Sequence, residues 1–154
     1  MLFRSAPSVV GFYGGLYKLF DRYCWRWGLL RSIGIVNVPT LDGCWTGFVR
    51  SSHDGHDEKH LVSVQIRQDW TQMQITLKGQ FSQSYSFLAA VLTHAPEGVV
   101  LAYEYRNEPI PNATDTMQMH YGTARLTMSP PGVMQGFYYT GRGRQNYGYI
   151  RLSR

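Results

Sequence analysis

Apolar and polar residues alternate with a period of two along most of the chain after Pro39, most clearly in Val62–Arg67 and Gln72–Leu77. This alternation is typical of a strand with one buried and one solvent-facing side. It predicts eight strands, which span Cys44–Ser51, His60–Asp69, Gln72–Lys78, Ser82–Thr93, Val99–Arg106, Thr116–Met128, Val133–Thr140 and Tyr147–Ser153.

The connections between these strands are short and rich in turn-forming residues. Asp54–Gly55, Pro96–Gly98 and Pro130–Gly132 suit tight turns. No connection is long enough for the crossover helix that parallel strands need. We therefore predict an all-β fold, a closed eight-stranded antiparallel up-and-down β-barrel of a minimal, lipocalin-like kind, over residues 39–154. The interior of such a barrel holds side chains or one small ligand. The many Tyr, Met and Phe residues predict an interior that is filled by side chains.

A helical pattern precedes the barrel. Apolar residues recur at helical spacing between Phe12 and Leu30, with charged residues on the opposite side, which predicts an amphipathic helical arm in residues 1–38. The uncharged run Ser5–Tyr17 has 13 residues, fewer than the ~20 that cross a bilayer. The arm is either a juxtamembrane segment at the cytoplasmic surface or a helix packed on the barrel. A third reading is that a longer N-terminus is missing and the arm is the tail of a membrane helix.

The charge distribution restricts the partners of the barrel. The net charge is +5, and residues 1–38 contribute five basic residues against one acidic residue, whereas the rest of the chain has 10 basic and 9 acidic residues. A nearly neutral domain neutralises few phosphates, which argues against duplex DNA or RNA as its main partner. A small anionic ligand is compatible with this charge. The two cysteines form no C-x-x-C pair, and we expect reduced thiols.

Catalytic motifs are missing from the sequence. It contains no G-x-S-x-G elbow, H-E-x-x-H pair, P-loop or dinucleotide-binding fingerprint. His53, His56 and His60 stand close to acidic residues and offer a metal site as one reading. The simpler reading is a solvated hairpin tip. We therefore predict a protein that is not an enzyme and that needs no metal or cofactor.

The segment Tyr138–Gly148 combines arginines, tyrosines, amides and glycines. Arg142 and Arg144 are suited to hold phosphates bidentately, and Tyr139 or Tyr147 to stack on a base. This combination predicts a site for a small nucleotide. An ordinary hairpin, with tyrosines in the core and arginines in water, fits the segment equally well.

A second polar and aromatic segment covers Tyr103–Ala113. Arg106 either forms a structural ion pair with Glu104 or Glu108, or lines the same ligand site. The prolines of this segment predict a rigid loop after Arg106. Elsewhere, Trp45 and Trp70 are predicted to anchor the core.

Several of these segments together resemble a known family. They are Gly43-x-Trp45, VQIRQDW from Val64, YEYRNEPIPNA from Tyr103, HYGTARL from His120 and YYTGRGRQNYG from Tyr138. Over Leu41–Arg154 the chain is similar to the two-transmembrane-helix, β-barrel effectors of cyclic-oligonucleotide-based antiphage signalling (CBASS). The last segment is the most specific, because its length and mixed chemistry are hard to reach by chance.

The resemblance implies a cyclic dinucleotide sensor at the cytoplasmic side of the bacterial inner membrane. Ligand binding would drive oligomerisation, after which the membrane helices of the full-length protein disrupt the membrane and kill the infected cell. The sequence lacks both helices as complete spans, so we expect a shortened form that is soluble or peripheral. The predicted ligand-binding residues are Arg142 and Arg144 for the phosphates, Tyr139, Gln145, Asn146 and Tyr147 for bases or ribose, and Thr140, Tyr105 and Arg106 beside them.

A carrier of a small apolar ligand is the alternative function, supported by the barrel and by Gly43-x-Trp45. It requires a roomy interior lined by aliphatic side chains. Three properties of the sensor are left open by the sequence, namely the preferred cyclic nucleotide, the number of subunits and the defence system that supplies the signal.

Overall fold

The computed structural model of the chain describes residues 6–113, 117–130, 132–141, 143 and 145–154. Their contacts divide the chain into two compact units. One unit comprises Met1–Thr40 together with Gln68–Gln72, and the other comprises Leu41–Arg67 and Met73–Arg154. The arm and one turn of the sheet therefore belong together, and the remaining residues form the barrel.

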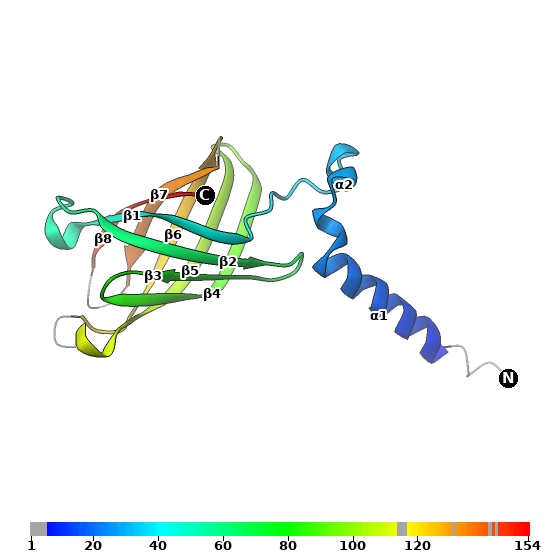
Figure 1. The fold of residues 1–154 in the computed structure, drawn as a ribbon, viewed down its shortest axis with the longest axis horizontal. Helices are drawn as coiled ribbons and strands as arrows, with labels where there is room; N and C mark the ends of the chain where they lie inside the picture. Colours follow the sequence, from blue (N-terminus) through cyan, green and yellow to red (C-terminus); the bar gives the residue numbers. More distant parts are fainter. Residues whose placement is uncertain (1–5, 114–116, 131, 142, 144) are drawn as a thin grey trace. The chain divides into compact units, whose positions relative to one another are not determined.

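The second unit is a closed β-barrel (Figure 1). Each strand pairs antiparallel with a neighbour in the order β1 to β8, and β8 returns to β1 through pairs such as Val49 with Ile150. The predicted all-β, eight-stranded barrel is thereby confirmed. The strands are β1 Gly43–Ser51, β2 His60–Gln68, β3 Met73–Lys78, β4 Ser82–Ala95, β5 Gly98–Pro109, β6 His120–Ser129, β7 Val133–Thr140 and β8 Tyr147–Ser153.

Two strand ends differ from the prediction by three residues or more, and the other differences are of one or two residues. β5 continues to Pro109, because β4 begins at Ser82 and pairs with it, and the Ile110 amide then donates to the Phe81 carbonyl at 3.0 Å. The prolines therefore follow the strand without shortening it. β6 begins at His120, where pairing with Asn107 begins, and not at Thr116, which lies outside the described residues.

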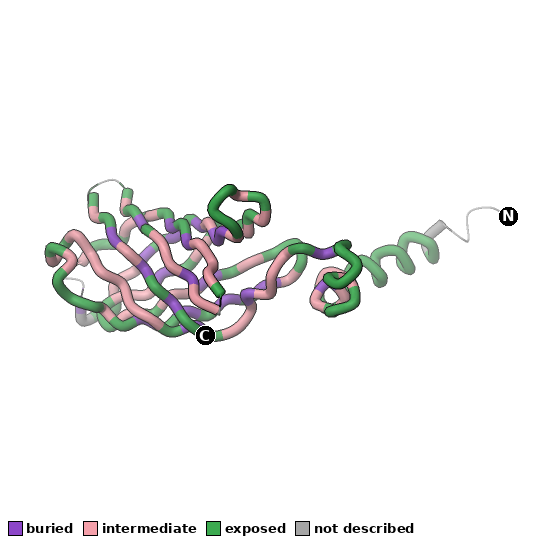
Figure 2. The backbone as a smooth tube through the Cα atoms, turned by 90° about the horizontal axis from the view of Figure 1, so that it is seen from above, coloured by how far each residue is buried: buried purple, intermediate pink, exposed green. Residues whose placement is uncertain are grey.

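The core of the barrel follows the alternation in the sequence. Along β2 every second residue is buried, and buried and exposed positions alternate on the strands in Figure 2. Trp45 is 1% exposed and its indole N–H donates to the Leu41 carbonyl at 2.8 Å, so the predicted anchor role of Trp45 is confirmed. The pattern buries aliphatic residues from both walls of the barrel, including Val64, Ile66, Leu101, Leu126, Met134 and Leu152.

The described part of the arm contains one long helix followed by two short helical elements, instead of a single amphipathic helix that continues to Leu30. α1 spans Ala6–Arg22, the 3₁₀ turn η1 spans Cys24–Arg26, and α2 spans Gly28–Ser32. Helical periodicity does not continue to Leu30, because Trp27 is extended with φ −65° and ψ 132° and Trp25 is fully buried. No helix among the described residues is both long enough and apolar enough to span a membrane.

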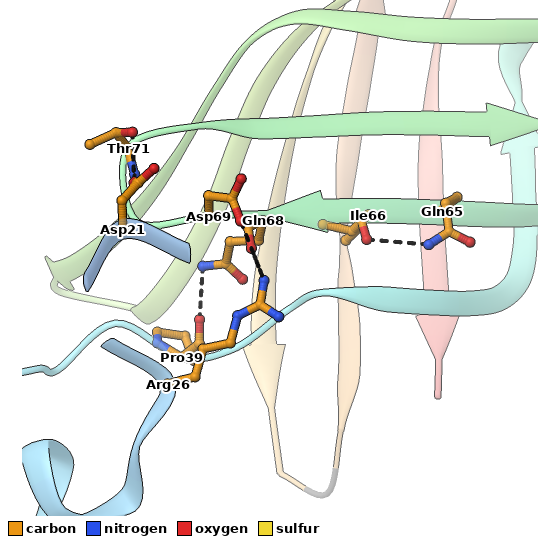
Figure 3. A network of polar contacts seen from close by, with 8 residues as sticks. All are labelled: Asp21, Arg26, Pro39, Gln65, Ile66, Gln68, Asp69 and Thr71. Atoms are coloured by element: carbon orange, nitrogen blue, oxygen red, sulfur yellow. Dashed lines mark hydrogen bonds and ion pairs between the residues drawn. The ribbon is translucent and has the colours of Figure 1, made fainter. Parts of the chain in front are cut away.

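The turn between β2 and β3 packs on this arm (Figure 3). The Asp21 carboxylate accepts hydrogen bonds from the backbone amide and the hydroxyl of Thr71, both at 2.8 Å. The Asp21 carbonyl accepts from the Trp70 amide at 2.9 Å. The Trp70 ring meets Phe20 edge-on at 5.5 Å and Trp25 at 6.0 Å. Trp70 therefore anchors the arm to the turn, and its predicted place in the core is wrong.

Polar contacts hold the other side of the same turn. The Arg26 guanidinium donates to the Gln68 carbonyl and lies 3.8 Å from the Asp69 carboxylate. The Gln68 amide, which is 4% exposed, donates to the Pro39 carbonyl at 3.1 Å (Figure 3). Residues 68–72 are thus fixed to the arm on both sides, while the strands that they join belong to the barrel.

Candidate functional site

The barrel contains a cavity of about 370 Å³ at one end. The connections that follow β1, β3, β5 and β7 contribute to its lining, so it opens at the end where these four connections lie (Figure 1). Its volume is in the range of small-molecule sites. The expectation of a completely filled interior is therefore wrong at this end of the barrel.

The inner part of the cavity is aromatic and aliphatic. Tyr103 and Tyr138 are 4% and 8% exposed, and Val49, Val62 and other aliphatic residues surround them. Burial raises the pKa of the Tyr103 phenol far above its ordinary value, so this group is a neutral hydroxyl at physiological pH. Such a floor suits a flat ring that carries few charges.

Two glycines make room for the cavity tyrosines. A Cβ at Gly122 would meet the Tyr105 ring, with its Cζ 2.5 Å away, and a Cβ at Gly148 would lie 2.5 Å from Cε1 of Tyr138. Both distances are too short for carbon atoms in contact. Each of these tyrosines therefore packs over the bare backbone of the glycine that it pairs with on the neighbouring strand.

Polar residues line the cavity above this floor. Ser84 on β4 pairs with Asn107 on β5, and Asn107 pairs with His120 on β6, so the three form one row across the sheet. All three line the cavity, and Ser84 and Asn107 are 6% and 7% exposed. The site thus combines an apolar floor with a polar wall.

Histidines from the β1–β2 connection and β2 form part of the opposite wall. His53 and His60 line the cavity, and the His60 ring Nε2 lies 2.6 Å from the Asp54 carboxylate. Glu58 brings a third potential metal ligand within 4.8 Å of these two. The hydrogen bond between His60 and Asp54 already explains the arrangement of two of these groups, and we keep the simpler interpretation of this loop as a polar hairpin tip.

Removing the carboxylate of Asp54 is expected to change how stability depends on pH. The hydrogen bond with His60 holds the pKa of Asp54 below its ordinary value, partly offset by desolvation. A lowered folded-state pKa contributes stability above the unfolded value, about 4 for aspartate, and loses it as pH falls through the folded value. Asp54→Asn is therefore less stable than the wild type at pH 7, and the difference shrinks below about pH 4. Urea unfolding at both pH values tests this.

Asp57→Asn is the matched control, because Asp57 is an exposed carboxylate in the same loop with no ion pair to another described residue. It should unfold like the wild type at both pH values. An Asp54→Asn deficit that persists unchanged at pH 3 would contradict the assignment to the ionised carboxylate.

The β7–β8 connection brings two predicted ligand residues to the cavity. The Thr140 hydroxyl accepts from the backbone N–H of Asn146 at 2.8 Å and donates to the backbone carbonyl of Asn146 at 3.0 Å, so these two residues are hydrogen-bonded to each other. Both residues line the cavity, as does Tyr105. Arg142 and Arg144, which lie between them in the sequence, are outside the described residues. The structure therefore gives the position of the loop ends but not that of the two arginines.

The other predicted ligand residues do not line the cavity. Tyr139 and Tyr147 are 57% and 54% exposed, because each lies one position from a strand residue that faces inward. Arg106 forms an ion pair with Glu108 at 2.5 Å, which confirms the structural alternative for this residue. Gln145 is exposed and has a positive φ of 34°. For all four residues a role in ligand binding stays a prediction.

Sequence reasoning missed several residues of the cavity, above all Tyr103, Asn107 and Tyr138. The signal that could have identified them is the alternation of inward-facing and outward-facing residues along each strand. In a strand, Tyr103, Tyr105 and Asn107 lie on one face, which lines the cavity, and Arg106 lies on the other face. Applying the period of two to each polar segment would have separated the inward residues from the outward ones.

Comparison with known proteins agrees with this architecture. Residues 36–154 match the protein family described as Cap15, cyclic dinucleotide receptor domain. The chain belongs to the Cap15 family. It is also 32% identical over 153 residues to CD-NTase-associated protein 15 of Yersinia aleksiciae, covering 97% of this chain and 71% of that protein.

The barrel is therefore the cyclic dinucleotide receptor domain of a CBASS-associated Cap15 protein. The family match includes every strand and every residue that lines the cavity. The description of the family is that of a receptor domain and not of an enzyme. The comparisons therefore confirm the predicted relationship to CBASS proteins that have a cyclic dinucleotide receptor domain. The ligand class of this domain is a cyclic dinucleotide.

Proposed function

We propose that the cavity at the open end of the barrel is the cyclic dinucleotide site, and that ligand binding drives self-association. This association would in turn lead to disruption of the inner membrane and to the death of the infected cell. The observation that carries the proposal is the cavity itself. It lies inside the receptor domain and joins a tyrosine floor to a polar wall.

The chemistry of the lining matches the parts of the ligand. A cyclic dinucleotide has two flat bases and two phosphates, and tyrosine rings and buried polar groups suit the bases. The basic side chains among the described lining residues are those of His53, His60 and His120. An arginine is always charged and can hold a phosphate through two parallel hydrogen bonds, which supports Arg142 and Arg144 as the phosphate ligands. Thr140 and Asn146, on either side of them in the sequence, line the cavity.

The β2–β3 hairpin supports a physical link from the ligand to the arm. His60 and Val62 on β2 and Leu77 on β3 line the cavity, whereas the turn of the same hairpin packs on Asp21, Trp25 and Phe20. A ligand shifts a conformational equilibrium only through different interactions with the two states. A hairpin that contacts the ligand at one end and the arm at the other satisfies this condition.

The surface of α1 supports a role of the arm at the membrane. Val9, Val10, Phe12 and Tyr13 are each at least 65% exposed, which is an unusual load of apolar side chains for a helix in water. Amphipathic and aromatic segments of this kind suit the boundary between headgroups and acyl chains. We therefore propose that the arm contacts the cytoplasmic face of the inner membrane.

Calorimetry with cyclic di-AMP, cyclic di-GMP, cyclic GMP-AMP and a cyclic trinucleotide tests the ligand site. The wild type is expected to bind at least one cyclic dinucleotide, and Arg142→Ala/Arg144→Ala to bind it at least a hundredfold more weakly, because charged hydrogen bonds contribute about 1.5–3 kcal/mol each. Arg151→Ala is the control, since Arg151 lies on β8 outside the cavity lining.

Undiminished affinity in a folded double variant would contradict the role of the two arginines. Sedimentation velocity with and without the bound dinucleotide tests self-association, and an unchanged sedimentation coefficient at saturation would contradict it. Preferential binding of a fluorescent fatty acid would instead favour the carrier function.

A further inference from the structure

The polar wall of the cavity contains buried groups whose hydrogen-bonding capacity is unused within the protein. Among the described residues, the Asn107 amide has one partner, the thioether of Met117, with Nδ2 at 3.6 Å from the sulfur. The hydroxyls of Ser84 and Tyr103 have no described partner. All three residues are more than nine-tenths buried and line the cavity.

Ser84, Tyr103 and Asn107 are largely buried but line the cavity, so a molecule in the cavity can reach their polar atoms. Native proteins keep few polar groups without hydrogen-bond partners outside functional sites. A thioether is a weak acceptor, so the contact with Met117 is easily exchanged for a stronger acceptor. The wall is therefore arranged to hydrogen-bond to a molecule in the cavity.

We infer that this wall reads the edge of an adenine base, with Asn107 as the residue that determines specificity. The inference rests on the proposed ligand site and names the base that it selects. A carboxamide presents one donor and one acceptor side by side, which matches the exocyclic amine and a ring nitrogen of adenine. Ser84, directly opposite Asn107 in the β4–β5 pairing, adds a hydroxyl to the same edge.

Guanine fits the same wall less well. Its O6 and N7 are both acceptors, which calls for a two-donor group such as arginine. The carboxamide of Asn107 offers one donor beside one acceptor, so it can satisfy only one of these two guanine atoms. The Tyr103 ring lies two positions along β5 from Tyr105, with 5.9 Å between the ring centroids, so the base has aromatic neighbours below its polar edge. The structure therefore assigns a cyclic dinucleotide with at least one adenine as the preferred ligand.

Calorimetry of Asn107→Ala, Asn107→Asp and Ser84→Ala against cyclic di-AMP, cyclic di-GMP and cyclic di-UMP tests the inference. We expect the wild type to bind cyclic di-AMP at least tenfold more tightly than the other two. Asn107→Ala should lose at least tenfold in affinity for cyclic di-AMP, and Asn107→Asp, which keeps the shape but lacks the donor, should lose as much. Thermal melting confirms that each variant is folded.

Glu104→Ala is the matched control, because Glu104 lies on the same strand, is exposed and does not line the cavity. It should bind cyclic di-AMP like the wild type. Equal affinity of folded Asn107 variants and the wild type for cyclic di-AMP, or a wild-type preference for cyclic di-GMP, would overturn the inference and leave the proposed function standing. Failure of the wild type to bind any cyclic dinucleotide would overturn both.

Discussion

Replacing Gly136 by alanine is expected to destabilise the barrel strongly. Gly136 lies in β7 and pairs with Leu126 on β6 and with Ile150 on β8. A Cβ at this position would clash with the Arg125 carbonyl and would lie 2.9 Å from the Leu126 Cα. Backbone atoms on a paired strand cannot turn away as a flexible side chain can, so the β6–β7 ladder has to open.

Opening this ladder should cost at least about 3 kcal/mol, the upper range for inserting a methyl group into a packed interior. That is a large part of the 5–15 kcal/mol that stabilises a typical domain. Urea denaturation followed by circular dichroism measures the loss. Gly79→Ala is the control, because its Cβ would lie 3.6 Å from the nearest atom, an ordinary contact. Equal midpoints for both variants would contradict this account of the strand packing.

Trp70→Ala is expected to release the arm from the β2–β3 turn. The ring of Trp70 contacts both Phe20 and Trp25, and Trp25 is fully buried. Removing a large buried aromatic side chain costs about 3–5 kcal/mol, and because Trp70 is 39% exposed we expect about 2 kcal/mol. The loss should raise the open population of the arm about 30-fold.

Limited trypsin digestion measures this opening, since Arg22 and Arg26 are the cleavage sites beside the contact. Cleavage at these two sites should accelerate in Trp70→Ala while the barrel keeps its unfolding midpoint. Trp27→Ala is the control, because Trp27 is 57% exposed in the same unit. Equal cleavage rates for the two variants would show that the Trp70 ring does not hold the arm. If the hairpin links ligand and arm, cyclic dinucleotide should slow this cleavage in the wild type and not in Trp70→Ala.

The alternation of residues was sufficient to predict the barrel. β7 and β8 begin and end at the predicted residues, and the other strands differ mainly at their ends. A period of two is a local property of the chain, and burying one face of eight consecutive strands leaves few arrangements other than closure. The segment Tyr138–Gly148 contributes Tyr138, Thr140 and Asn146 to the lining of the cavity, and its role in ligand binding stays a prediction.

The sequence by itself therefore determined the number and order of the strands, the antiparallel barrel and one loop of the candidate site. Only the tertiary structure decided that Ser84, Asn107 and His120 form one row, and that Trp70 packs on the arm instead of in the core. The physical reason is that these neighbours come from separate segments of the chain. The row depends on the register in which β4, β5 and β6 pair, and the position of Trp70 depends on how the β2–β3 turn packs on the arm. Neither property leaves a pattern in the local sequence.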